Sequence, residues 1–184
     1  MTACPGSGKT RTLTHRLAYQ VLRDPASKKI KIAITYTNRA AEEITNRLEG
    51  MNIDQSSIWA GTIHQFCMHF IIRPYAMYSK RLCKGYRIID DYSKKAYGRE
   101  IAERLGMHLN YYDDPFQYEN VRTEYKRVLK EKKEIDFDAI LLISEELLAS
   151  CAFIGSNIAS VISSILVDEF QDTNELQYSI LSTI

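Results

Sequence analysis

The chain lacks several features that would assign its class at once. No apolar run reaches the length of a membrane-spanning helix, and the N-terminus shows no secretory signal. The four cysteines are scattered without a Cys-x-x-Cys pair, which favours reduced thiols in a cytoplasmic protein. Neither sign of charge dominates, since 24 Lys and Arg face 23 Asp and Glu. Any nucleic-acid-binding surface must therefore be local.

A metal site is also missing from the pattern. His64, Cys67 and His69 lie close together in the sequence, but no fourth ligand accompanies them. We expect them to be helical neighbours that fill a core or a groove. The remaining composition, with 45% hydrophobic and 26% charged residues in 184, is that of an ordinary globular protein. This length suffices for one substantial core, or for one core with an insertion.

A glycine-rich segment near the start carries the strongest signal. Residues 3–10 read Ala-Cys-Pro-Gly-Ser-Gly-Lys-Thr, and apolar residues spaced four apart (Leu13, Leu17 and Val21) predict a helix from residue 9 to residue 23. Glycines let successive backbone N–H groups point at an anion, a lysine adds charge, and a hydroxyl can bind Mg²⁺. The segment therefore predicts a phosphate-binding loop before a helix N-terminus. The alternative is a plain glycine-rich turn.

A second signal lies far along the chain. The apolar run Val161–Val167 ends in Asp168-Glu169. Such a run predicts a strand buried in a parallel sheet, and its carboxyl end is where open α/β sheets bind ligands. Asp168 is suited to hold Mg²⁺, and Glu169 to orient or deprotonate an attacking water. The alternative is that both acids simply precede the next helix.

The first third of the chain alternates between helix and strand. Strands are predicted at 30–35 and 57–60, and helices at 38–49 and 62–72, with Asn38 as the N-cap of the former helix. This order predicts a parallel sheet with crossover helices.

The middle of the chain is different. An extended piece at 87–89 is followed by predicted helices at 90–106, 116–134 and 136–150, without strands between them. This block predicts a helical insertion, after which the chain returns to the sheet. Its charge run, 126–134, mixes both signs and is expected to be a solvated helix face, with a nucleic-acid patch as the lesser alternative.

Two strand-to-helix turns combine aromatic, hydroxyl and amide groups. One is 35–41, where Tyr36 could stack on a base and Asn38 could help hold a phosphate; the other is 61–67. Each alone could be no more than helix caps and core side chains. Both are expected at the sheet edge that carries the phosphate loop, and this favours the functional interpretation.

Four segments together resemble UvrD/Rep/PcrA-type superfamily 1 DNA helicases. They are Ala3–Thr10, Ala33–Ala41, Gly61–Cys67 and Leu166–Gln177, in the order seen in that family. The resemblance implies an α/β fold: a P-loop NTPase (RecA-like) domain whose parallel sheet is flanked by helices, with a mostly helical inserted subdomain. We expect a first ATP-binding part at 1–78, the inserted subdomain at 79–151 and a second ATP-binding part at 152–184.

The resemblance also implies roles for individual residues. ATP would be bound by the phosphate loop and its neighbour: Pro5, Gly6, Ser7, Gly8, Lys9, Thr10 and Arg11, the last approaching the adenine. Thr10 and Asp168 would hold Mg²⁺. Glu169 would be the catalytic base, aided by Lys9 and by Gln171 as a γ-phosphate sensor. Single-stranded DNA would contact four residues: Tyr36, Asn38, Thr62 and His64. Ile63 stands where the family often has phenylalanine, so stacking is not expected there.

The resemblance further implies a larger motor. Family members carry a further strand before the phosphate loop and a second motor domain after the last of these segments, so we expect this chain to be a piece of an ATP-dependent helicase that moves 3′ to 5′ on single-stranded DNA. That second domain would be its partner, and the piece alone would not unwind DNA. The alternatives are the motor of a helicase–nuclease in recombination or repair, a P-loop NTPase of another class such as a small-molecule kinase, and a non-catalytic module.

Overall fold

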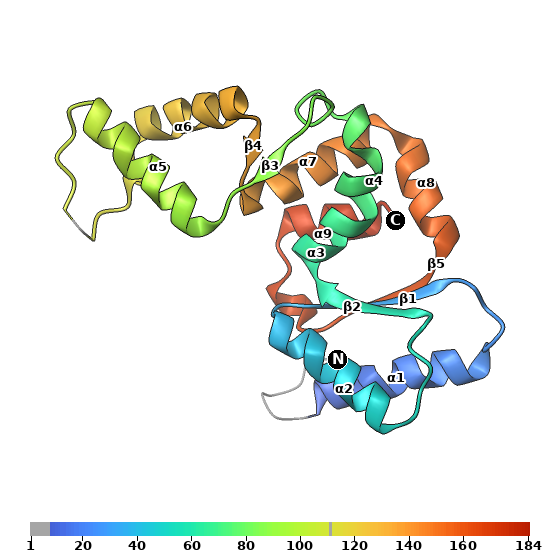
Figure 1. Cartoon of the computed structure of the whole chain (residues 1–184). Coiled ribbons are helices and arrows are strands. Elements are labelled where there is room, and N and C mark those ends of the chain that lie inside the picture. The colour runs from blue at the N-terminus through green and yellow to red at the C-terminus, as the bar shows by residue number, and fades with distance from the viewer. Residues whose placement is uncertain (1–7, 111) are drawn as a thin grey trace.

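A three-stranded parallel sheet forms the centre of the protein (Figure 1). The computed structural model describes residues 8–110 and 112–184. The strands are β1 (Ile30–Thr35), β2 (Ile58–Thr62) and β5 (Ile162–Val167), in the order β2-β1-β5. Thr35 lies opposite Thr62, and Ile34 opposite Val167, so the carboxyl ends of all three strands meet at one edge. The predicted α/β class with a parallel sheet is confirmed.

Two helices cover one face of the sheet. They are α1 (Lys9–Arg23) and α2 (Asn38–Gly50), which lie together beneath the strands in Figure 1. Ala33 of β1 points to this side and packs with Leu17, Ile44 and Leu48, which are fully buried. The small side chain of Ala33 lets the helices approach the sheet closely, and their apolar stripes close this core.

The other face carries the larger core. Ile32 and Ile34 alternate with Ala33 and point to this side, as the period of a strand requires. The segments on this face are α3 (Ile63–Phe66), a π-helical turn (Cys67–Ile72), α4 (Arg73–Tyr75), α7 (Phe137–Ser150), α8 (Ala152–Val161) and α9 (Glu175–Ser182). Their apolar side chains form one cluster with those of the sheet.

A separate arm projects from this body (Figure 1). It contains α5 (Asp91–Arg104) and α6 (Glu119–Lys132), and it joins the body through β3 (Arg87–Ile88) and β4 (Glu134–Ile135), which pair in parallel. The arm has its own small core, in which Ile101, Val121 and Leu129 are buried. The molecule therefore has a body and an arm with distinct hydrophobic clusters.

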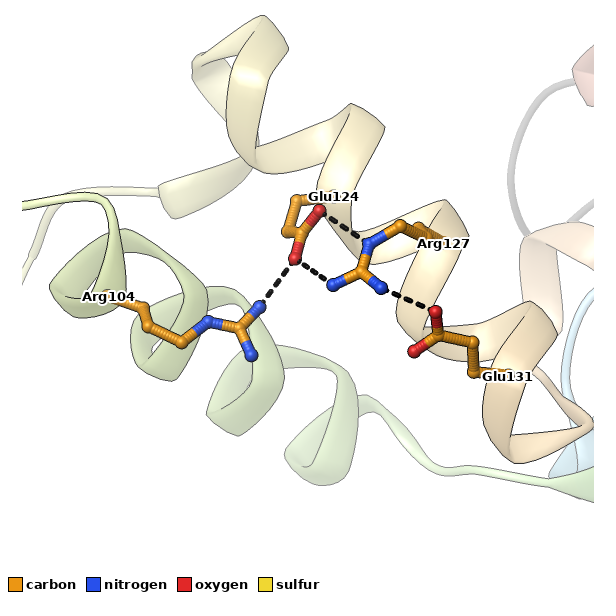
Figure 2. A network of polar contacts seen from close by, with 4 residues as sticks. All are labelled: Arg104, Glu124, Arg127 and Glu131. Carbon is orange, nitrogen blue, oxygen red and sulfur yellow. Dashed lines mark hydrogen bonds and ion pairs between the residues drawn. The ribbon is translucent and has the colours of Figure 1, made fainter.

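An ion-pair network links the two helices of the arm (Figure 2). Glu124 of α6 accepts from Arg104 of α5 at 2.6 Å and from Arg127 at 2.5 Å, and Arg127 also pairs with Glu131. Hydrogen bonding to Arg127 lowers the pKa of the Glu124 carboxyl. Both arginines are more than half exposed, so the network orders the pair of helices but adds little stability.

Polar contacts fix the base of the arm. The hydroxyl of Tyr125 donates to Asp136 Oδ2 at 2.9 Å, and Lys94 Nζ pairs with Asp138 at 2.5 Å. Glu134 is buried and pairs with Arg87 across β3 and β4. The charged residues of the run 126–134 are exposed, as expected of a solvated face, except Glu134, which is buried where the chain turns inward.

Several predicted elements differ from the observed ones. The extended piece expected at 87–89 corresponds to β3, but no strand was expected between the helices of the inserted block, and β4 lies between α6 and α7; its two residues leave no periodic pattern. The predicted helix 116–134 is split into a 3₁₀ turn (Pro115–Gln117), α6 and β4. Val161 was placed in the strand, but it ends α8, a helix that the sequence analysis missed.

Helix starts also differ by a residue. Thr37, and not Asn38, caps α2, because its hydroxyl accepts from Ala40 N at 3.2 Å. Thr62 was placed in a helix, but it ends β2 and caps α3.

The boundaries 1–78, 79–151 and 152–184 stay a prediction. Because α7 packs in the core of the body, we propose that the arm itself ends at β4.

Candidate nucleotide and nucleic-acid site

The start of α1 lies at the carboxyl edge of the sheet. Gly8 caps this helix with a positive φ of 83°, a backbone conformation that glycine adopts without steric cost. No acidic residue occupies the first turn of α1, so the unpaired N–H groups and the helix dipole leave this end positive. The end of the helix is therefore suited to an anionic group such as a phosphate.

Lys9 meets Glu169 across the site. Lys9 Nζ donates to Glu169 Oε2 at 2.5 Å, although 160 positions separate the two residues in the chain. Hydrogen bonding to Lys9, and then to Gln171, lowers the pKa of the Glu169 carboxyl. The lysine and the carboxylate thus neutralise each other, and an incoming phosphate would compete with Glu169 for Lys9.

Thr10 and Asp168 form the second contact across the site. The Thr10 hydroxyl donates to Asp168 Oδ2 at 3.1 Å, and Asp168 N is held by Ile34 O at the end of β1. A hydroxyl and a carboxylate are hard oxygen ligands, and Mg²⁺ commonly uses one or two of these together with phosphate oxygens and water. No cluster of three or more His, Cys, Asp or Glu suited to a metal occurs among residues 8–110 and 112–184. The two residues therefore fit Mg²⁺ delivered with a nucleotide, but not a metal held by protein alone.

Glu169 has an unusual backbone. Its φ of 51° and ψ of 45° lie in the left-handed region, which non-glycine residues rarely adopt. This conformation turns the chain directly after β5 and lets Glu169 reach Lys9 while Asp168 faces Thr10. Gln171 donates to the same Glu169 oxygen as Lys9. Strained residues of this kind cluster at functional sites, and here the strain sits on the predicted catalytic base.

The predicted DNA contacts line one groove beside this site. Tyr36, Asn38, Thr62 and His64 all border a hollow of about 700 Å³. Tyr36 follows β1 and is 47% exposed; burial and the nearby Asp172 raise the pKa of its phenol. The side chain of Tyr36 is thus available at the surface, at the carboxyl edge of the sheet that also carries Asp168 and Glu169.

Thr62 and His64 come from the turn after β2. Thr62 Oγ1 accepts from Gln65 N at 3.3 Å, and Gln65 Oε1 accepts from Thr62 N at 2.9 Å. This capping box orders the start of α3. His64 packs edge-on against Phe137, with ring centroids 6.0 Å apart, and burial lowers the pKa of its imidazole although Asp138 opposes the shift. His64 therefore presents a mainly neutral imidazole to the groove at neutral pH.

Of the other residues predicted to bind ATP, Pro5, Gly6 and Ser7 lie outside the described residues. Arg11 is exposed, and its Nε donates to His15 Nε2 at 3.5 Å, so its approach to adenine stays a prediction. Cys67 is buried in the core, and burial raises the pKa of its thiol to about 12, which fits a core residue and not a metal ligand.

Part of the groove was not predicted from the sequence. Trp59, Met68, Arg73 and Phe137 line it together with the predicted residues. Phe137 belongs to α7, so only the folded chain brings it to this side. The aromatic and basic character of the segment 59–73 was the available signal.

Within the part of the chain that the structure describes, no helix is both long and apolar enough to cross a membrane.

Comparison with known proteins identifies the family of the chain. The family model of the UvrD/REP helicase N-terminal domain matches residues 1–115 and 108–184. Two similar proteins are the ATP-dependent DNA helicase PcrA of Leuconostoc citreum and DNA helicase II of Escherichia coli K12, each 27% identical over 97% and 95% of this chain. PcrA of Staphylococcus aureus is 26% identical. The chain spans 28% of the length of each of these relatives. It belongs to the UvrD/REP helicase N-terminal domain family.

Proposed function

We propose that this chain binds Mg²⁺-ATP and single-stranded DNA as the first motor half of an ATP-dependent DNA helicase that moves 3′ to 5′. The observation that carries the proposal is the meeting of Lys9 with Glu169, and of Thr10 with Asp168, across about 160 residues of sequence. The DNA groove borders the same sheet edge, so one structural unit can hold both ligands. The direction of movement rests on the family resemblance alone.

Each residue has a role in this proposal. Lys9 leaves Glu169 and binds the terminal phosphates, while the N-terminus of α1 receives the phosphate charge. Thr10 and Asp168 hold Mg²⁺, which when bound neutralises charge on the phosphates. Glu169, released from Lys9, orients and deprotonates the attacking water. Gln171 follows the movement of Glu169 through their hydrogen bond.

The chain alone is proposed to bind nucleotide weakly and to lack unwinding activity. Phosphoryl transfer in such motors gains orders of magnitude in rate from arginines on a second part of the protein. The relatives are more than three times longer than this chain, which leaves room for that part. Strong DNA-dependent ATP hydrolysis by these 184 residues would contradict this point.

Two titrations test the proposal. Binding of a fluorescent ATP analogue should require Mg²⁺ and should weaken at least about tenfold in Lys9→Ala, because the lysine ammonium is lost. A labelled single-stranded oligonucleotide should bind with an affinity that falls as salt rises, read from its fluorescence anisotropy. This affinity should be lower for Tyr36→Ala. Nucleotide binding without any DNA binding at low salt would instead indicate a P-loop NTPase of another class.

A further inference from the structure

The groove extends past the residues that the proposed function uses. Beyond Tyr36 and His64 it is lined by Trp59 of β2, by Met68 and His69 of the π-helical turn, and by Arg73 of α4. We propose that Trp59, His69 and Arg73 form a second contact station for the same unpaired DNA strand. This proposal rests on the proposed function and adds a base-stacking and phosphate-binding subsite to it.

Trp59 and His69 form a stacked pair. Their ring centroids lie 6.3 Å apart with an angle of 29° between the planes, and His69 is exposed. Phe66 and Phe70 support the indole edge-on from the core side, at 6.0 and 5.6 Å. The pair is thus a rigid aromatic surface at the groove wall, and such surfaces stack nucleic-acid bases without sequence preference.

Gly61 allows the indole to take this position. A Cβ at residue 61 would lie 2.6 Å from Trp59 Cη2, so only glycine leaves room for the ring against the strand. Gly61 also precedes Thr62 at the end of β2, where the predicted DNA contacts begin. The same local sequence therefore places Trp59 next to Thr62 and His64 in one groove.

The π-helical turn brings the other two residues to the groove. Arg73 N donates to Met68 O, five residues back, and five residues also separate His64 from His69. This wider spacing is frequent at functional sites. It leaves Phe70, Ile71 and Ile72 buried while Met68, His69 and Arg73 line the groove. Arg73 is exposed and offers a phosphate contact.

The chemistry of the lining favours an unpaired strand over a protein segment. The described residues that line the groove include two histidines, an arginine, hydroxyl groups and amides, but no carboxylate. Asp138 and Asp172 lie near His64 and Tyr36, which are predicted DNA contacts outside the proposed second station. Aromatic faces interleaved with cationic and hydrogen-bonding groups are the usual surface for single-stranded nucleic acid. Duplex DNA does not fit, because its bases are already stacked on each other.

The test uses the only tryptophan of the chain as a probe. Titration with an oligothymidylate should quench Trp59 fluorescence in step with the anisotropy of the labelled strand. His69→Ala should weaken binding about fivefold or more, as removal of a stacking ring does. Arg73→Gln should weaken it and lower the slope of log affinity against log salt by about one. His108→Ala and Arg81→Gln, exposed residues that do not line the groove, are the matched controls.

The outcomes separate this inference from the proposed function. DNA binding that depends on Tyr36, leaves Trp59 fluorescence unchanged and is unaffected by His69→Ala and Arg73→Gln would overturn the second station alone. A duplex bound as tightly as the single strand would also overturn it. Absence of any strand binding by the folded wild-type chain would overturn both. Circular dichroism of each variant should match the wild type, since both substituted residues are exposed.

Discussion

At the scale of single residues, the pairing of Lys9 with Glu169 sets the expected behaviour of the proposed nucleotide site. The Glu169 carboxylate is paired with the Lys9 ammonium, which a phosphate would need, and Gln171 also donates to this carboxylate. Part of the phosphate-binding energy must therefore replace an existing ion pair. The site is self-neutralised until a stronger anion arrives, which favours a triphosphate over a weakly charged ligand.

Removal of the Glu169 charge should separate binding from catalysis. In Glu169→Gln, Lys9 loses its competing anion, so a fluorescent ATP analogue should bind as tightly as to the wild type or up to about fivefold tighter. The fluorescence titration measures this directly. In any longer form of the protein that hydrolyses ATP, the same change should lower the rate by about 100-fold or more, because the base is lost.

The matched control for this variant is Glu175→Gln, which removes an exposed carboxylate from the first turn of α9. It should leave nucleotide affinity unchanged. Weaker nucleotide binding by Glu169→Gln alone would mean that Glu169 helps to hold the nucleotide, contrary to the competition described here.

At the scale of elements, strand β2 links the fold to the groove. Its residue Gly61 is buried, and the Trp59 indole lies against it. Gly61→Ala should force the ring or the strand to move, because the new Cβ would lie within 3 Å of two indole atoms and of Gln65 Oε1. We expect a loss of about 1–3 kcal/mol in the free energy of unfolding, measured by urea denaturation.

Gly50→Ala provides the control for this prediction. Gly50 ends α2, and nothing lies within 4 Å of a Cβ built there. Stability should stay equal or rise by up to about 1 kcal/mol, since alanine is the better helix former. A Gly61→Ala variant as stable as Gly50→Ala, with unchanged Trp59 emission, would contradict the close approach of the indole.

The elements also show where sequence reasoning succeeds. Strand β1 was predictable because Ile30, Ile32 and Ile34 alternate, and α1 because its apolar residues recur every four positions. Helix α8 was missed, since the apolar residues at 154, 158 and 161 run directly into those of β5 and give no boundary. An extended piece was expected at the position of β3, but β4 was missed, because its two residues have no local pattern and pair with β3 across the arm.

One part of the candidate site could likewise be predicted from the sequence, and another part could not. Lys9, Thr10, Asp168 and Glu169 could be expected to meet, because a phosphate loop and a strand ending in two acids both belong at the carboxyl edge of a parallel sheet. The aromatic character of the segment 59–73 was a signal, but it could not place Trp59 in the groove, because that position depends on a contact with Gly61 and on the π-helical spacing of the next turn. The left-handed backbone of Glu169 likewise leaves no trace in composition.

At the scale of the whole molecule, the hydrophobic cluster of the arm and the two clusters of the body predict two levels of stability. The cluster of the arm, around Ile101, Val121 and Leu129, is smaller than the larger cluster of the body, which packs on the α7 side of the sheet. Ionic contacts such as those of Figure 2 add little to it, because they are solvent-exposed. The arm should therefore open locally before the body unfolds.

Gly98→Ala should expose this difference. A Cβ at residue 98 in α5 would lie 2.9 Å from the Phe116 ring and 3.1 Å from Pro115, so the packing of the arm must loosen. Amide hydrogen exchange, read by mass spectrometry, should quicken in α5 and α6 and stay unchanged in β1 and α7. Gly50→Ala serves again as the control, and equal acceleration in body and arm would show that they unfold as one unit.

The connection between arm and body decides which movements the arm can make. Strands β3 and β4 lie side by side there. They are joined by hydrogen bonds of 2.9 Å from Arg87 N to Lys133 O and from Ile89 N to Ile135 O. A single linker would let the arm spin, but this paired ribbon resists torsion, because twisting would break both bonds. Bending across the ribbon keeps them. Because Lys94 of the arm also pairs with Asp138 of α7, we expect any movement of the arm to be a small bend about one axis across the ribbon, and not a rotation about its length.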